Sequence, residues 1–363
     1  MKKLFCTVLL SLLLLSCAPL KNTEPSTLPP PISAEDELPP VTPPQISYPA
    51  SPEHCADAYL DSKAVRLYEK DGVRYIRLID LCDYEVFTDG ENFTAKFNFK
   101  GRSYDADGFF DGKDWYITTE LLNSLGFKTF NETGELLFTY IPTSIPEDIE
   151  IPVLMYHAVS DEVWGIRELF VKPENMEKQI VWLLDNGYTP IFFEDLASLD
   201  GIEKPVILTF DDGYDDNYLY LYPILKKYNV KATVFIITDT VGWKNKLTEE
   251  QILEMSRSGL VSFQSHTATH PDLDLVSPEQ QERELTSSKL YLARLLKKES
   301  FVLCYPTGRY DSSALKFTKE NYSFAVTMND SRLYNTSDDP YTVRREYIAR
   351  STTLSQFEKM LTK

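Results

Sequence analysis

The chain has 363 residues, of which 43% are hydrophobic and 13% aromatic, a length and composition that favour two or three globular domains. Its formal net charge is −18 at pH 7, with 37 Lys and Arg against 55 Asp and Glu. So acidic a chain is a poor partner for nucleic acids and anionic lipid surfaces, and we expect no nucleic-acid-binding function. A neutral or cationic polymer suits it better, although charge of this size can also serve solubility alone.

The first 17 residues have the pattern of an export signal. Lys2 and Lys3 precede an apolar run over residues 4–15, which is shorter than the roughly 20 residues of a membrane span. The run ends in Leu-Leu-Ser-Cys17, which resembles a bacterial lipobox. This resemblance implies cleavage before Cys17, a lipid on its thiol and a protein anchored on the extracellular side of the bacterial cell membrane. An ordinary cleaved signal and a secreted product are the alternative.

Residues 18–56 contain dense proline, as in PSTLPPPISAEDELPPVTPPQ, and few large apolar side chains. Such a segment cannot bury enough surface to offset its ordering entropy, so we predict a disordered, semi-rigid tether that includes His54. Beyond the signal the cysteines are Cys55, Cys82 and Cys304, and no CxxC pair exists, which excludes a zinc knuckle. A disulfide between Cys55 and Cys82 remains open.

Residues 57–141 are predicted to form a small α+β domain. Two alternating runs flank Asp71-Gly72, which indicates a hairpin. Tyr75-Ile76 and Tyr116-Ile117 occupy matching places in two similar stretches, which indicates a weak internal duplication. The pattern resembles the stalk-like N-terminal domain of copper amine oxidases. Since the segment has no cluster of metal ligands, we infer no copper and expect a spacer or wall-binding role.

From about residue 150 to 363, strand-like and helix-like segments alternate, which is typical of a parallel α/β sheet or barrel. Function in such folds sits at the C-terminal ends of the strands. The predicted strands are 153–156, 206–210, 233–237, 261–264, 301–305 and 324–327, and the predicted helices are 172–186, 218–228, 248–258, 278–298 and 312–320.

Two motifs follow strands of this predicted sheet. Asp211 and Asp212 end an apolar run and precede Gly213, and two adjacent carboxylates need a compensating charge, such as a divalent cation. His266 and His270, in the sequence HTATH, follow another strand and are expected on one side of a turn. Two His and one Asp, with open positions for water, form a plausible catalytic zinc site. A surface or capping role is the alternative for an HxxxH pair alone.

Together, TFDDG and HTATH resemble motifs of the polysaccharide deacetylases, carbohydrate esterase family 4. The segments LMYHAV and YPTGRYD resemble the branch that deacetylates poly-N-acetylglucosamine. The resemblance implies a distorted (β/α) barrel over residues 150–363, with Asp211 as general base and Asp212, His266 and His270 as ligands of Zn²⁺, or of Co²⁺ or Ni²⁺. It also implies that the backbone near Pro306-Thr307 assists the oxyanion, and the predicted oxyanion or substrate residues are Tyr305, Thr307 and Arg345.

The chain departs from the family pattern at two places. No His follows His270, so the family's C-terminal acid is absent, and His157 at the end of the first barrel strand is the candidate acid. A packed strand-end histidine is the alternative. Cys304 stands where many members carry an arginine that orients the base, and Arg345 or the adjacent Arg344 is a candidate replacement.

Several polar and aromatic residues around these motifs remain ambiguous. Asp215 and Asp216 are predicted to start a solvated helix, where carboxylates favour the helix dipole. Sugar stacking and ordinary packing are both open for the nearby aromatic residues Tyr214, Trp243, Tyr305 and Tyr310.

The sequence therefore predicts an exported, metal-dependent hydrolase that removes N-acetyl groups from an N-acetylglucosamine polysaccharide, either a biofilm matrix glycan or peptidoglycan. Two alternatives remain: a non-catalytic, wall-associated glycan-binding lipoprotein, and an O-deacetylase of an acetylated hemicellulose.

Overall fold

The computed structural model describes residues 48–88, 92–328 and 333–361. The predicted signal, Cys17 and most of the predicted tether lie outside the described residues. Within the described ranges, no helix has both the length and the apolar character that a membrane crossing requires.

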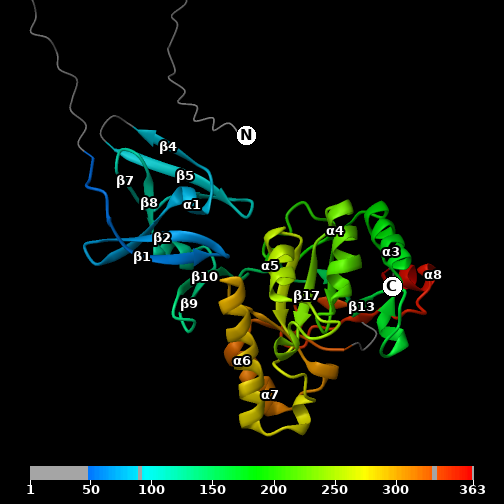
Figure 1. Cartoon of the computed structure of the whole chain (residues 1–363). Coiled ribbons are helices and arrows are strands. Elements are labelled where there is room, and N and C mark those ends of the chain that lie inside the picture. Colours follow the sequence, from blue (N-terminus) through cyan, green and yellow to red (C-terminus); the bar gives the residue numbers. More distant parts are fainter. Residues whose placement is uncertain (1–47, 89–91, 329–332, 362–363) are drawn as a thin grey trace, which may run out of the picture. The chain divides into compact units, whose positions relative to one another are not determined.

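The N-terminal part of the described chain is a seven-stranded sheet with a three-stranded sheet beside it (Figure 1). The larger sheet has the order β7-β8-β3-β2-β1-β10-β9, and the smaller has the order β4-β5-β6. The elements are β1 (Glu53–Leu60), β2 (Lys63–Lys70), β3 (Val73–Arg77), α1 (Leu78–Leu81), β4 (Tyr84–Thr88), β5 (Phe93–Phe99), β6 (Arg102–Asp105), β7 (Gly108–Phe110), β8 (Trp115–Thr118), α2 (Thr119–Ser124), β9 (Phe127–Phe130) and β10 (Leu136–Tyr140).

The predicted hairpin and the predicted duplication both have a structural counterpart. Strands β2 and β3 pair antiparallel around Asp71 and Gly72, which have φ values of 53° and 75°, and this confirms the hairpin. Strands β3 and β8 pair antiparallel with Ile76 opposite Ile117, and each strand leads into a short helix. The matching isoleucines thus lie opposite each other on neighbouring strands, where both are fully buried.

The predicted tether extends too far into the chain. Strand β1 begins at Glu53, so His54 and Cys55 belong to the sheet. The first five residues of β1 are exposed, and this removes the alternation of apolar residues that would have revealed the strand. Cys55 and Cys82 are free thiols in this structure.

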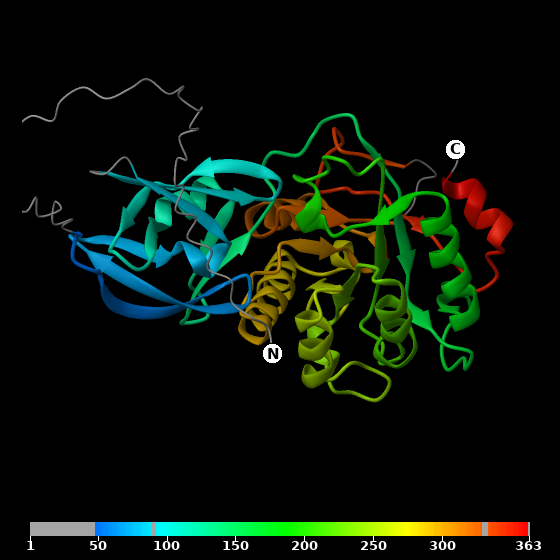
Figure 2. The same cartoon turned by 90° about the horizontal axis from the view of Figure 1, so that it is seen from above.

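The second part is a curled sheet of parallel strands with helices packed on its outer face (Figures 1 and 2). Its order is β20-β19-β18-β17-β16-β12-β22, and β15 pairs with β16. The strands are β11 (Glu150–Ile151), β12 (Val153–Tyr156), β13 (Ala158–Val159), β14 (Phe170–Val171), β15 (Tyr188–Pro190), β16 (Lys204–Phe210), β17 (Ala232–Ile236), β18 (Val261–Ser265), β19 (Val302–Cys304), β20 (Phe324–Val326), β21 (Tyr334–Asn335) and β22 (Glu346–Tyr347).

The helices begin where capping and proline signals predict. Pro173 and Pro278 each stand in the first turn of a helix, and Thr248 and Gln251 form a capping box. The helices are α3 (Pro173–Asp185), α4 (Tyr222–Tyr228), α5 (Glu249–Arg257), α6 (Pro278–Leu296), α7 (Ser312–Asn321) and α8 (Leu354–Leu361), and a π-helix, η3 (Asn217–Leu221), precedes α4. The 3₁₀ turns are η1 (Arg167–Leu169), η2 (Phe193–Asp195), η4 (Thr238–Thr240), η5 (Leu273–Leu275) and η6 (Pro306–Gly308).

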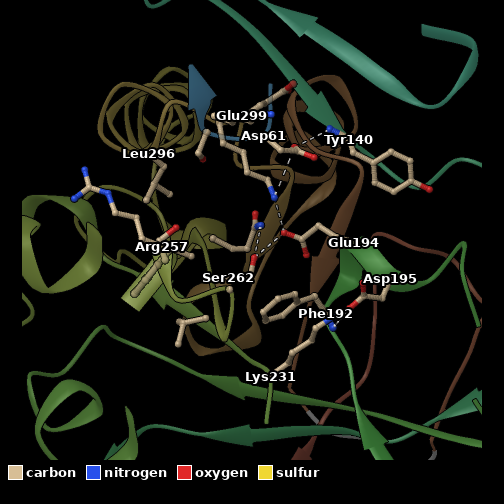
Figure 3. Close-up of a pocket in the computed structure, with 18 of the residues that line it drawn as sticks. Asp61, Tyr140, Phe192, Glu194, Asp195, Lys231, Arg257, Ser262, Leu296 and Glu299 are labelled. Atoms are coloured by element: carbon tan, nitrogen blue, oxygen red, sulfur yellow. Dashed lines mark hydrogen bonds and ion pairs between the residues drawn. The ribbon is translucent and has the colours of Figure 1, made fainter. Parts of the chain in front are cut away.

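The two ends of the parallel strands have different surroundings. At the N-terminal ends of β17 and β18 lies a cavity of about 490 Å³, lined by residues such as Asp61, Glu194 and Ser262 (Figure 3). One of its carboxylates is paired within the cavity: Glu194 accepts from Ser262 at 2.8 Å and from Lys298 at 3.1 Å. The predicted catalytic residues follow the C-terminal ends of β12, β16 and β18, so this cavity is separate from them.

Candidate active site

The two adjacent aspartates occupy a sharp turn directly after β16. Asp211 continues the strand, because its N–H donates to the Tyr156 carbonyl at 3.0 Å. Asp212 then adopts φ 72° and Gly213 φ 63°, both in the left-handed region. A Cβ at Gly213 would lie 2.7 Å from Cδ1 of Ile236, so a larger residue would disturb the packing as well. The turn separates the two carboxylates into different surroundings.

The HTATH segment is a loop held by its own polar side chains. Thr267 and His270 have φ values of 64° and 65°, so the segment is not the first turn of a helix. Thr269 donates its N–H and its hydroxyl to the carboxylate of Glu284, at 2.7 and 2.6 Å. The His270 N–H donates to Thr267 Oγ1 at 3.0 Å. These bonds bring both imidazoles to the same place despite the unusual backbone.

Asp212, His266 and His270 form a group that could hold a metal ion. Asp212 Oδ1 lies 3.5 Å from His266 Nε2 and 3.6 Å from His270 Nε2. Tetrahedral zinc with bonds of about 2.1 Å places its ligands roughly 3.4 Å apart. The three donors therefore fit a divalent cation with little movement, and three protein ligands leave a position for substrate or water.

The surroundings of His266 suit a metal ligand. Its Nδ1 lies 2.8 Å from the Cys304 carbonyl oxygen, so Nδ1 carries the hydrogen and Nε2 keeps its lone pair. Burial lowers the pKa of His266 to about 4, with the neighbouring His270 acting in the same direction. The imidazole is thus neutral, which is the form that binds metal.

A second possible group, Asp211, His266 and Cys304, is poorly suited to a cation. The Arg345 guanidinium donates to Asp211 and also approaches Cys304 Sγ at 3.2 Å. A metal ion there would sit against a buried positive charge. Beside the Asp212 group, the ammonium of Lys246 donates to the Asp212 backbone carbonyl at 2.7 Å and not to a ligand atom, so this group is the better candidate.

Asp211 is held by a bidentate ion pair with Arg345. The two guanidinium nitrogens approach Oδ1 and Oδ2 at 2.7 and 2.8 Å, and Asp211 is only 3% exposed. Burial alone would raise the pKa of Asp211, but the charge and hydrogen bonds of Arg345 outweigh it and hold this pKa well below its usual range. The carboxylate is therefore ionised at any physiological pH.

Of the two candidate arginines, only Arg345 reaches the site. Arg344 NH1 lies 3.3 Å from Asp338 Oδ2. Arg345 also donates to Thr209 Oγ1 and the Thr327 carbonyl, both at 3.0 Å, and its side chain is 1% exposed. The enclosed guanidinium therefore lies on the base candidate Asp211, where the sequence predicted a replacement for the orienting arginine, and not among side chains open to a substrate.

His157 lies beside Asp211 at the end of β12. Its Nε2 is 3.9 Å from Asp211 Oδ2, and its ring packs edge-on against Tyr347 with centroids 6.2 Å apart. The side chain is 15% exposed, so one side of the imidazole remains accessible. His157, Asp211, Asp212, His266 and His270 therefore gather at one edge of the sheet, as predicted.

The residues predicted around the oxyanion are less favourably placed. The Tyr305 N–H donates to the Val326 carbonyl at 3.1 Å, and its buried ring stacks on Tyr310 with centroids 4.4 Å apart, so Tyr305 offers neither a free N–H nor a sugar platform. Thr307 is exposed with φ 55°, and its hydroxyl donates to Asp272 Oδ1 at 2.7 Å. Trp243 is 63% exposed, whereas Tyr214 packs against Trp164 and the Lys246 ammonium.

Two residues near the site have surroundings that the sequence did not indicate. Asp216 was expected at a solvated helix start, but it is 3% exposed and its Oδ1 accepts from the Val159 N–H at 3.0 Å. Lys246 donates to the Asp212 carbonyl at 2.7 Å. A lone Asp or Lys carries no burial signal in a single sequence, so only the folded contacts identify them.

The chain is similar to several known proteins. The polysaccharide deacetylase family model matches residues 199–322. The deacetylase PplD of Streptococcus pyogenes, solved with acetate, is 32% identical with a TM-score of 0.55, over 59% of this chain and 99% of that one. The Bacillus subtilis protein YxkH, named for the same family, is 39% identical over 49% of this chain, and the match spans 64% of its length. A poly-β-1,6-N-acetyl-D-glucosamine N-deacetylase of Staphylococcus aureus is 29% identical over 47% of this chain and 67% of its own.

The chain belongs to the polysaccharide deacetylase family. Its curled parallel sheet is the fold expected for this family, and the motifs TFDDG and HTATH supply the group that could hold a metal ion.

Proposed function

We propose that the protein is a metal-dependent hydrolase that removes N-acetyl groups from an N-acetylglucosamine polysaccharide. One observation carries the proposal: Asp212, His266 and His270 converge at metal-ligand spacing beside an ionised, arginine-paired Asp211. The ligands would be these three residues, and zinc is the first choice because two imidazoles and one carboxylate suit it. Cobalt or nickel would suit the same donors.

When bound, a divalent cation supplies Lewis acidity, which lowers the pKa of a water molecule and polarises a carbonyl group. Asp211 is the base that accepts the proton water loses as its oxygen attacks the acetyl carbon. Asp211 is ionised beside Arg345, so it can accept this proton, and the adjacent Asp212 would help to hold the metal. His157 donates a proton to the nitrogen as the carbon–nitrogen bond breaks, and acetate and a free amine result.

The substrate class rests on similarity and chemistry together. The Staphylococcus aureus relative is named for poly-β-1,6-N-acetylglucosamine, which supports an N-acetylated glycan here. Deacetylation makes cationic amines, and a protein of net charge −18 tolerates that product. Peptidoglycan is a second candidate substrate of the same chemistry.

Release of acetate by the purified protein tests the proposal. Protein loaded with Zn²⁺, Co²⁺ or Ni²⁺ should release acetate from oligomeric N-acetylglucosamine or from peptidoglycan, and Asp211→Asn should release at least about 10²-fold less. Release from acetylated xylan alone would replace the amide assignment by ester hydrolysis. Bound metal with no release from any substrate would favour a glycan-binding protein instead.

The proposed location is the outer side of the bacterial cell membrane. It rests on the sequence up to Cys17, which lies outside the described residues. In a bacterial host the protein should sediment with membranes, and Cys17→Ala should shift it to the soluble fraction. A Cys17→Ala variant that still sediments with membranes would argue against lipid anchoring at this residue.

A further inference from the structure

Asp216 and Asn217 are buried polar residues that the mechanism above does not use. They are 3% and 0% exposed, and they stand where the turn after β16 enters the π-helix η3. The π-helix closes through the Tyr222 N–H and the Asn217 carbonyl. Such single-turn π-helices are rare and occur frequently at functional sites. Buried polar side chains such as these are stable only when they are hydrogen-bonded, so their partners indicate what they do.

Their hydrogen bonds converge on the backbone around His157. Asn217 Nδ2 donates to the His157 carbonyl and to Asp216 Oδ1, both at 3.0 Å. Asp216 Oδ1 also accepts from the Val159 N–H at 3.0 Å. The peptide groups on both sides of Ala158 are thus fastened to a single side-chain pair. Because both groups facing Nδ2 are acceptors, the orientation of the Asn217 amide is fixed.

The ring nitrogens of His157 make few polar contacts. Within the described part of the chain, its Nδ1 is buried without a hydrogen-bond partner. Its Nε2 is 3.9 Å from Asp211 Oδ2, beyond hydrogen-bond length, and its ring packs edge-on against Tyr347. The position of the imidazole therefore depends strongly on its own backbone, which Asp216 and Asn217 hold together with the pairing of β13 to β14.

We propose that Asp216 and Asn217 are positioning residues, which hold the His157 backbone so that its imidazole reaches the leaving nitrogen. The proposal rests on the acid role of His157 in the proposed function. A misplacement of about 1 Å in a catalytic group can cost on the order of 10²-fold in rate. Burial raises the pKa of Asp216 to about 7, and its second oxygen, Oδ2, has no partner among the described residues. An asparagine at 216 should therefore keep the acceptor that Val159 and Asn217 need.

The first test is turnover of single variants of the metal-loaded protein on oligomeric N-acetylglucosamine. Asn217→Ala should lower kcat by about 10- to 100-fold, with KM and bound metal nearly unchanged. Asp216→Ala should behave alike, whereas the kcat of Asp216→Asn should stay within a few fold of the wild type.

Asn186→Ala is a matched control, since Asn186 donates to the Trp182 carbonyl at an exposed helix end. Should Asn217→Ala fold poorly, Asn217→Ser keeps one donor and serves in its place, with melting temperature measured throughout.

A double-mutant cycle with His157→Ala decides whether the pair acts through His157. If it does, adding Asn217→Ala to His157→Ala should change kcat by less than about threefold. The proposal would be overturned if Asn217→Ala lowered kcat by the same factor in the wild type and in His157→Ala, or if Asn217→Ala kept the wild-type kcat. Wild-type turnover of His157→Ala would remove the acid role itself and this proposal with it, while Asp211→Asn would still report separately on the hydrolase.

Discussion

Asp212→Asn should weaken binding of a divalent cation by at least about 10²-fold and abolish acetate release with it. The variant loses the anionic donor that lies 3.5 and 3.6 Å from the two imidazole nitrogens. Asparagine is the right replacement because residue 212 has φ 72°, a conformation that Asn adopts more readily than Ala. Calorimetric titration with Zn²⁺, or the visible spectrum of the Co²⁺ form, measures the affinity.

The neighbouring variant Asp211→Asn provides the contrast. Its side chain faces Arg345 rather than the imidazole pair, so it should bind metal within a few fold of the wild type and still lose turnover. Melting temperatures of both variants control for unfolding. Equal metal affinity in wild type and Asp212→Asn would contradict the ligand assignment, and a loss of metal in Asp211→Asn alone would move the site to the group containing Cys304.

The architecture of residues 150–363 was largely predictable because local signals agreed with the final packing. Strand β12 has the predicted bounds, Val153–Tyr156, and α5 starts after the capping threonine Thr248. Buried parallel strands are continuous apolar runs, so β16 and β17 were visible as such. By contrast, the predictions did not include β22, whose two residues, Glu346 and Tyr347, are too few to show periodicity.

The site was predictable where its residues lie close in sequence and not where they meet only in space. Asp211, Asp212, His266 and His270 occur in two compact motifs. Arg345 reaches Asp211 from 134 residues away, so two adjacent arginines remained open until the fold placed one of them. Asp216 was predicted to be solvated because carboxylates near the start of a helix usually are. Only its buried contact with the Val159 N–H shows otherwise.

Arg345→Met should destabilise the fold by about 3–5 kcal/mol and reduce turnover strongly. Methionine keeps much of the volume but leaves Asp211 as a buried, unpaired carboxylate, and such a charge is costly. Because the wild-type ion pair lowers the pKa of Asp211, its stabilisation is present above the unfolded pKa of about 3.9 and fades as pH falls below it. The difference in melting temperature between wild type and variant should therefore persist from neutral pH down to about pH 4 and narrow only as the pH falls below that value.

A second substitution should restore much of this loss. Cys304 Sγ lies 3.6 Å from Asp211 Oδ2 and 3.2 Å from an Arg345 nitrogen, so the end of β19 reaches the same carboxylate from another direction. In Arg345→Ala, the vacated volume should admit the guanidinium of Cys304→Arg and re-pair Asp211. We expect the double variant to exceed Arg345→Ala in both melting temperature and kcat, by about tenfold or more in kcat, since one recovered charge-assisted pair exceeds 1.4 kcal/mol. Cys304→Arg alone should be destabilised, because two guanidinium groups would share one carboxylate. A double variant no better than Arg345→Ala would show that the direction of approach matters, and that Arg345 does more than neutralise the base.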